Sequence, residues 1–376
     1  MIEVLMRQGV RVPAMMAALL CCGAWAGAPP LGLPPLPIPA DNPQTPAKIA
    51  LGDALFHDAR FSSTGEIACK NCHLDAIAFH DGRPVAKGVR MQRGTRNAPT
   101  VVNAAYYDYQ FWDGRAQTLE QQALQPLLNP IEHGLRSEDE ILNIVRRDAN
   151  YVARFAEAFG ASAQSITITH LTQAIAAYER TLISGDSAFD RWYYGGDLTA
   201  MSDSAKRGFE VFTGPGHCAQ CHTVTRQYAL FTDQAFHNAN ASFALLGADP
   251  ERRAAEFMQA RTANIDQRVL SDREASELGR FAVTGRREDL GAFKTPSLRN
   301  IARTPPYLHD GSLNTLEKVV EYFNNGGKLN PRDPGPNPFQ SPLIRPLNLS
   351  AEQKRDLVAF LKSLTSPEYA EPAYRG

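Results

Sequence analysis

Helical spacing of apolar residues dominates this chain, and alternating strand patterns are scarce. Residues 137–140 and 350–353 each begin with a serine that is followed three residues later by Glu or Gln, and both lead into apolar residues at helical spacing. This arrangement is a capping box, which marks the first turn of a helix. Residues 165–183 and 316–324 are two further predicted helices. The pattern therefore predicts a mainly α fold with long connecting loops.

An apolar run near the N-terminus, residues 12–23, follows two arginines and precedes small residues up to position 28. A basic start, a short apolar stretch and small residues at its end are typical of a secretory signal peptide, here residues 1–28. The run is too short to cross a bilayer comfortably, and no other run approaches that length. We therefore expect an exported protein without a membrane span, located in the periplasm.

Length, composition and charge add three points to these predictions. Residues 29–46 are rich in proline, which predicts an extended tether or an arm that wraps around the protein, rather than a core element. The 376 residues are enough for about two or three domains. The net charge of −1 gives no reason to expect a nucleic-acid partner.

Two Cys-x-x-Cys-His pentapeptides carry the chemistry: residues 69–73 and 218–222. This spacing is the attachment signal of a c-type haem, in which both thiols add to the haem vinyl groups. The histidine that follows then supplies the proximal imidazole to the iron. We predict covalent attachment through Cys69 and Cys72 for the first haem and Cys218 and Cys221 for the second, with the proximal ligands His73 and His222.

The cysteine count supports this interpretation over a metal site. The chain has six cysteines: two lie in the apolar leader, at 21 and 22, and the other four belong to the two pentapeptides. The alternative is zinc, which also uses Cys-x-x-Cys pairs, but zinc ribbons place those pairs roughly 15–20 residues apart. The pairs here are much farther apart, so two c-type haems are the predicted cofactors.

An internal repeat surrounds the two pentapeptides. Residues 52–56 and 208–212 each begin with a Gly and end with a Phe, and one of these segments precedes each pentapeptide. Downstream, Trp112-Asp113-Gly114 and His309-Asp310-Gly311 are each followed by Thr-Leu-Glu at one spacing, and Arg-Asn recurs at 96–97 and 299–300. The repeat predicts two related cytochrome c-like domains, residues 47–198 and 199–376, each wrapping one haem.

With these features the chain resembles the bacterial di-haem cytochrome c peroxidase family, which includes the MauG-type enzymes. The resemblance covers roughly residues 46–365. Besides the two haem motifs, it is carried by residues 96–100, 110–115, 129–132, 293–300 and 306–311. It implies that the N-terminal domain holds the peroxidatic haem, that the C-terminal haem receives and stores electrons, and that one calcium ion lies between the domains.

The resemblance assigns roles around the first haem. Glu132 matches the distal glutamate that moves a proton between the two peroxide oxygens. Gln122 and Pro126 match distal-pocket positions of the MauG subgroup. Ordinary peroxidases of the family block the iron with a histidine in the preceding loop, but Val89 stands at that position here. We therefore expect a first haem that is open without reductive activation.

Further positions match the junction between the haems. Trp112 matches the tryptophan that lies between the two haems and can relay electrons. Asn97, Thr304 and Pro306 match calcium positions, the last two through backbone oxygens. His309 is expected to stay near the second haem as a hydrogen-bonding residue.

The distal ligand of the second haem departs from the family pattern. The family uses methionine or, in MauG, tyrosine, and the matching residue here is Phe323, which cannot bind iron. Tyr322 is the first candidate if the helix shifts by one residue, and Met258 is the second. A phenolate would lower the reduction potential and a thioether would raise it.

The leading functional hypothesis is a periplasmic peroxidase that reduces hydrogen peroxide with electrons from a small redox protein, a cytochrome c or a cupredoxin. The alternative is a MauG-like enzyme that oxidises an aromatic side chain of a partner protein. MauG itself has a surface tryptophan two residues before its second haem motif, where this chain has Gly216. A non-catalytic electron carrier is a third class, and a homodimer is a possible assembly.

Overall fold

The computed structural model of the chain describes residues 28–246, 249–260, 264–328 and 337–370, so the predicted signal peptide lies outside the described residues, apart from its last position. The fold is mainly α, as predicted, with one short two-stranded antiparallel sheet. The helices are α1 Pro46–Phe56, α2 Leu119–Leu128, α3 Glu138–Arg146, α4 Ala149–Phe159, α5 Ile168–Glu179, α6 Ala188–Tyr193, α7 Asp203–Thr213, α8 Phe243–Leu246, α9 Pro250–Gln259, α10 Ile265–Ser271, α11 Arg273–Glu277, α12 Phe281–Thr284, α13 Leu316–Asn324 and α14 Ala351–Ser363; the strands are β1 Phe236–His237 and β2 Phe293–Lys294.

The predicted helix starts agree with the caps that the structure shows. Ser137 accepts a hydrogen bond from the backbone amide of Glu140 at the start of α3, and Ser350 forms a complete capping box with Gln353 at the start of α14. Helix α5 is shorter than the predicted 165–183, because Thr167 caps it and only residues 168–179 are α-helical. These local hydrogen bonds satisfy backbone amides that have no partner within the helix.

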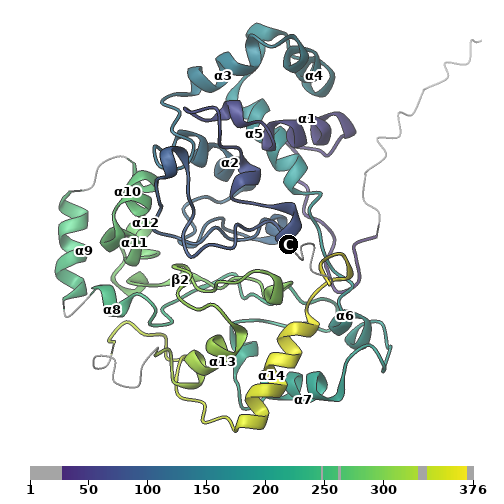
Figure 1. Ribbon diagram of the computed structural model, residues 1–376, viewed down its shortest axis with the longest axis vertical. Helices are drawn as coiled ribbons and strands as arrows, with labels where there is room; N and C mark the ends of the chain where they lie inside the picture. The colour runs from purple at the N-terminus through teal and green to yellow at the C-terminus, as the bar shows by residue number, and fades with distance from the viewer. Residues whose placement is uncertain (1–27, 247–248, 261–263, 329–336, 371–376) are drawn as a thin grey trace, which may run out of the picture.

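Two hydrophobic cores divide the described chain (Figure 1). The first joins residues from Leu51 to Ala176 and lies among α1 to α5; the second joins residues from Phe189 to Leu364 and lies among α6, α7, α13 and α14. A third, smaller cluster from Leu246 to Leu290 packs α8 to α12 beside them. Phe189 belongs to the second core, so α6 packs with the C-terminal half although the predicted boundary lies after it.

The repeated glycines explain why both halves use the same helix crossing. An ideal Cβ on Gly52 of α1 would lie 1.9 Å from the carbonyl oxygen of Ala174 in α5, and one on Gly208 of α7 would lie 2.0 Å from that of Asp356 in α14. Only glycine permits these close approaches. Phe56 and Phe212, four residues later, are fully buried in the two cores. The sequence repeat is therefore a packing repeat.

One pair in the predicted repeat needs correction. The structural counterpart of Asn300 is Asn103, not Asn97: both have a left-handed conformation, both begin a 3-10 helix, and each precedes Trp112 or His309 by nine residues. Asn97 precedes Trp112 by fifteen residues, and its counterpart is Lys294, which precedes His309 by fifteen. The short Arg-Asn match of the sequence was out of register.

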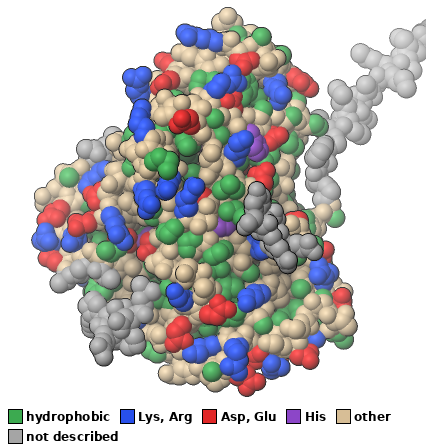
Figure 2. Space-filling model, viewed as in Figure 1, with side chains coloured by type: hydrophobic (Ala, Val, Ile, Leu, Met, Phe, Trp, Pro, Cys, Tyr) green, Lys and Arg blue, Asp and Glu red, His purple; other side chains and the backbone are tan. Residues whose placement is uncertain are grey.

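The proline-rich arm contacts both halves of the molecule. The carbonyl of Gly32 accepts hydrogen bonds from Arg299 and from the amide of Ala229, while the carbonyl of Pro34 accepts one from Tyr106. The arm thus lies along the molecule instead of extending from it. Within the described residues no helix is long and apolar enough to cross a membrane. Acidic and basic side chains are interspersed over the face shown in Figure 2.

Candidate active site

A single continuous cavity lies between the two main cores and is lined by both pentapeptides. Cys69, Cys72 and His73 of the first and Cys221 and His222 of the second line it. Cys218 does not, and its thiol lies 3.3 Å from the carbonyl oxygen of Gly216. The four cysteine thiols are free of disulfides.

Both motif histidines are oriented in the same way. Nδ1 of His73 lies 3.1 Å from the carbonyl oxygen of Phe79, and Nδ1 of His222 lies 2.8 Å from that of Phe231. A carbonyl can only accept a hydrogen bond, so Nδ1 carries the proton and Nε2 keeps its lone pair. Fixing the tautomer through Nδ1 is how proteins prepare an imidazole for a metal. The cavity and its histidines therefore fit two haems bound through these motifs.

The distal side of the first motif is polar. Gln122 and Pro126 of α2 and Glu132 of the following loop line the cavity. The Oε2 atom of Glu132 is inaccessible to solvent and has no hydrogen-bond partner among the described residues. Burial, reinforced by the charge of Asp266 and opposed by that of Arg115, raises the pKa of Glu132 to about 8. Glu132 is thus a carboxyl group that can hold a proton at neutral pH.

The loop at residues 86–94 packs against Glu132 and is hydrogen-bonded to its backbone. The amide of Val89 donates a hydrogen bond of 2.9 Å to the carbonyl oxygen of Glu132, and Val89 is fully buried. Gly88 is required there, because an ideal Cβ would lie 2.0 Å from the carbonyl oxygen of Ile131. Met91 is 71% exposed. Neither Val89 nor Met91 is among the residues that line the cavity.

Trp112 and His309 occupy equivalent places at the junction of the two halves, and both line the cavity. The Trp112 indole donates to the carbonyl oxygen of Asn97, at 3.0 Å. His309 lies 2.8 Å from Oε2 of Glu277 through Nε2, and its ring stacks on Phe293 at 3.8 Å between centroids. Burial opposes ionisation of Glu277, but the hydrogen bond with His309 lowers its pKa below the usual range.

The distal side of the second motif is apolar. Val319 and Phe323 of α13 line the cavity at the positions that Gln122 and Pro126 hold in α2. Tyr322 does not line it: this residue is 3% exposed, and its hydroxyl donates to the carbonyl oxygen of Ala239 at 2.6 Å. Met258 packs in the third cluster, also away from the cavity. Ligation by Tyr322 or Met258 stays a prediction, one that side-chain replacement can test.

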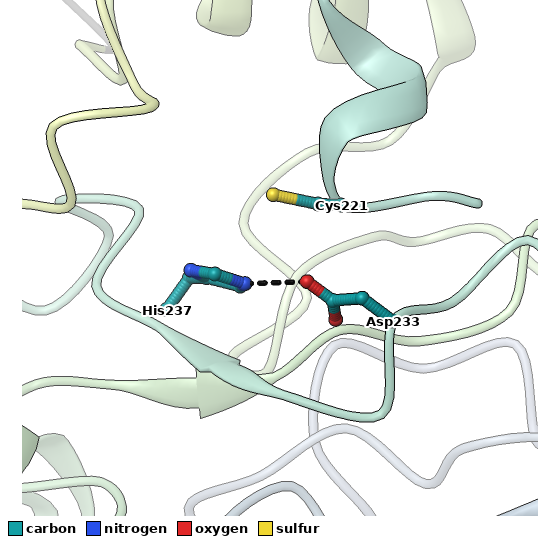
Figure 3. A group of neighbouring side chains, drawn as sticks. All are labelled: Cys221, Asp233 and His237. Atoms are coloured by element: carbon teal, nitrogen blue, oxygen red, sulfur yellow. Dashed lines mark hydrogen bonds and ion pairs between the residues drawn. The ribbon is translucent and has the colours of Figure 1, made fainter.

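Three ligand-type residues gather beside the second motif: Cys221, Asp233 and His237 (Figure 3). Nε2 of His237 lies 2.7 Å from Oδ2 of Asp233, and the hydrogen bond with Asp233 and the neighbouring Cys221 raise the pKa of His237 to about 10. Burial opposes ionisation of Asp233, but the hydrogen bond from His237 lowers its pKa. Because Cys221 is a predicted attachment thiol, we assign this group to the edge of the second haem site.

The predicted calcium residues lie along one wall of the same cavity. Asn97, Thr304 and Pro306 all line it. Nδ2 of Asn97 donates to the carbonyl oxygen of Arg83, which leaves Oδ1 of Asn97 available. The donor set consists of neutral oxygens, a type that Ca²⁺ accepts when water completes its coordination.

Four charged residues of the cavity region had no role predicted from the sequence, although Lys294 lies in the block 293–300 that carries the family resemblance. Asp266 forms an ion pair with Arg115 and accepts a hydrogen bond from Asn129, near the distal side of the first motif. Glu277 is hydrogen-bonded to His309. Glu179 and Lys294 are buried in the cavity wall. Asp266 and Glu277 lie more than a hundred residues after Glu132, in segments without a recognisable motif. Only the folded chain brings them to the site.

The fold and the site define a class: a mainly helical protein with two haem-attachment motifs around one cavity. Among solved structures it is similar to a MauG-like protein associated with microbial copper homeostasis, at a TM-score of 0.74 and 32% identity, covering 93% of this chain and 99% of that one. The diheme peroxidase BthA from Burkholderia thailandensis has the same fold, at a TM-score of 0.66 and 23% identity, covering 92% of this chain and 96% of that one.

Sequence relatives identify the family. The family described as di-haem cytochrome c peroxidase matches residues 46–198. The cytochrome-c peroxidase IdrP1 of Denitromonas iodatirespirans is 38% identical, over 94% of this chain and 93% of the relative. The methylamine utilization protein MauG of Methylorubrum extorquens is 37% identical, over 90% and 82%. The chain belongs to the di-haem cytochrome c peroxidase and MauG family, and it is an oxidoreductase of the cytochrome-c peroxidase type with two c-type haems.

Proposed function

We propose that this protein reduces hydrogen peroxide to water in the periplasm, using two electrons from a small redox protein, a cytochrome c or a cupredoxin. The observation that carries the proposal is the first distal side, where Oε2 of Glu132 is buried without a partner in the cavity shared with His73. An unpaired buried carboxyl is costly unless it serves a bound molecule. Peroxide, which must exchange a proton between its oxygens, suits that position.

Cys69, Cys72 and His73 would hold the first haem, which would supply an iron able to reduce peroxide. The residues of the chain perform the proton chemistry. Glu132 accepts the proton from one peroxide oxygen at Oε2 and returns it to the other oxygen, so that the leaving oxygen departs as water. Two electrons and two protons balance the reaction, giving two water molecules. Gln122 lies on the same side and can orient the peroxide by hydrogen bonding.

The loop at 86–94 supports an open first site in the resting protein. Val89 replaces the blocking histidine of ordinary family members and points its side chain into packed surroundings, while Met91 is exposed. Peroxide therefore has access without prior reduction. Trp112 lines the cavity that both motifs share, which supports a role for its indole in passing electrons from the second haem to the first. Calcium held by Asn97, Thr304 and Pro306 would brace this junction.

A MauG-like activity, oxidation of an aromatic side chain on a partner protein, is the second candidate, since an open first haem serves both reactions. Gly216 favours the peroxidase. It is buried, its amide donates to the carbonyl oxygen of Val211 at 2.8 Å, and an ideal Cβ would lie 2.7 Å from that oxygen. A tryptophan could not occupy this position as the structure stands.

Steady-state kinetics of the as-isolated, haem-loaded protein test the proposal. Reduced cytochrome c and reduced cupredoxin are offered as donors, and peroxide-dependent donor oxidation is followed. Sustained turnover with either donor supports the peroxidase. If neither donor is oxidised while a partner protein gains an oxidised tryptophan or tyrosine, the MauG-like activity is the correct one. A resting spectrum with two low-spin haems and no peroxide reaction would leave only an electron carrier.

A further inference from the structure

Lys294 is a buried cation at the junction of the two halves. It ends strand β2, is 7% exposed and lines the cavity that both haem motifs share. Its Nζ lies 3.1 Å from the centre of the Tyr107 ring, which belongs to the N-terminal half. A lysine in such a position has lost most of its water and must find compensation in the protein or in a ligand.

The other cations of the cavity wall have carboxylate partners or access to water, whereas Lys294 has only its cation–π contact with Tyr107. Arg96 forms an ion pair of 2.6 Å with Asp113, and Arg115 forms one of 2.6 Å with Asp266. Lys87 is only half-buried, so water can reach it. The ammonium of Lys294 makes no hydrogen bond or ion pair with any residue in the described ranges. Burial lowers the pKa of Lys294 to about 7, and only the more distant charge of exposed Asp108 works against this.

The pseudo-symmetry of the molecule places Lys294 opposite the predicted cation site. The amide of Lys294 donates to the carbonyl oxygen of Trp112, at 2.8 Å, and the amide of its counterpart Asn97 donates to that of His309, at 2.7 Å. On one side of the junction a neutral asparagine lines the cavity beside backbone carbonyls that could hold a cation. On the other side the chain supplies the positive charge itself. The junction therefore has an unpaired positive charge facing a cavity built for anionic cofactors.

We propose that Lys294 is the counter-ion of a haem propionate at the junction of the two domains. Each haem brings two propionates into the cavity, and a carboxylate is the partner that a buried ammonium lacks here. The pair neutralises charge in a region of low dielectric, where an unscreened propionate would stabilise the ferric over the ferrous haem. Lys294 is thus a positioning residue that sets a reduction potential. The proposal depends on the two haems and is independent of how peroxide is handled.

Potentiometric titration of the haem-loaded protein, followed by absorbance, tests it. K294M removes the charge and keeps most of the side-chain length, K294R keeps the charge, and K362M removes an exposed lysine of α14 that does not line the cavity, as a matched control. We expect K294M to lower the midpoint potential of one haem by a tenfold change in the ferric–ferrous equilibrium, about 59 mV for a one-electron couple. K294R and K362M should keep both potentials.

Two results would overturn the proposal. One is a K294M protein with full haem content and both potentials unchanged; the other is a K294R protein whose potential shifts as far as that of K294M. If K294M does not retain both haems, resonance Raman spectra of K294R test whether Lys294 contacts a propionate. The propionate bending band of one haem must then differ between K294R and the unaltered protein, and identical bands count against the pair.

Discussion

The two haem sites come from one packing repeat, yet their carboxyl groups are in opposite states. Near the first motif, burial raises the pKa of Glu132 and of Glu179 to about 8. Near the second, Asp233 is bonded to His237 and Glu277 to His309, and the pKa of both carboxyls is lowered. The first site stores protons, whereas the second holds fixed charges.

The distal residues differ in the same sense. Equivalent positions on α2 and α13 carry Gln122 and Pro126 at the first site but Val319 and Phe323 at the second. A polar pocket with a carboxyl that can accept a proton and return it suits a reaction that moves protons between oxygens. An apolar pocket with paired charges changes little when an electron arrives, which suits storage. The repeated helices therefore give the two haem sites the same geometry, while a few different side chains on those helices give the two distal pockets different chemistry.

The largest expected effect is that of removing the proton carrier. E132Q keeps the size of the side chain but cannot accept a proton, so the rate of peroxide cleavage should fall by about 10²–10⁴-fold. Stopped-flow mixing with peroxide measures it, with haem content checked by absorbance. E138Q, an exposed glutamate at the start of α3, should react like the unaltered protein. A rate for E132Q within a few-fold of normal would remove Glu132 from the reaction.

Stability should fall with rising pH because of the buried carboxyl groups of the first site. Glu179 is 4% exposed, and burial, with Glu120 adding to it and Arg180 opposing it, raises its pKa to about 8. The folded protein then binds more protons than the unfolded chain between about pH 4.5 and 8. The free energy of unfolding therefore decreases over this window, by at most about 1.4 kcal/mol per pH unit and group.

Denaturant unfolding at several pH values measures this slope. E179Q has no titrating group at that position, so its slope should be shallower than that of the unaltered protein. D233N offers the contrast from the second site, because a carboxyl with a lowered pKa contributes stability above pH 4. Equal slopes for E179Q and the unaltered protein would show that Glu179 ionises normally.

The rate of the peroxide reaction should rise with pH, because burial also raises the pKa of Glu132. Glu132 must be ionised to accept the peroxide proton, so kcat/KM for peroxide should increase about tenfold per pH unit below 8 and level off above it. A pH series of initial rates measures this limb. In E132Q the limb should disappear. If it persists there, another group controls the dependence.

The smallest effects concern the second distal side. F323Y would place a phenol in the cavity at the position where the family has its ligand, and a phenolate should lower the potential of the second haem. Y322F should leave its electron paramagnetic resonance signal unchanged and cost about 1 kcal/mol of stability, since the hydroxyl bonds to the Ala239 carbonyl. A changed haem signal in Y322F would instead establish Tyr322 as the distal ligand.

Local patterns in the sequence were sufficient to predict much of the fold and the haem-attachment motifs. The attachment motifs, the mainly α class, the caps at Ser137 and Ser350 and the repeated glycines depend on residues a few positions apart, so chemistry and short-range geometry dictate them. Resemblance to the family added Glu132, Trp112 and the calcium residues. The register of the Arg-Asn pair was wrong, because a two-residue match is too short to specify equivalence.

By itself, the sequence determined the two c-type haems and the division into two related halves, since covalent attachment needs only five consecutive residues and a helix crossing needs only a glycine at the right place. Only the tertiary structure decided the charge states and ion partners of the buried side chains around the cavity. Asp266, Glu277, Glu179 and Lys294 act through burial and through partners distant in the chain, and neither can be read from neighbouring residues. Whether a carboxyl holds a proton, or a lysine needs an anion, depends on what the folded chain places around it.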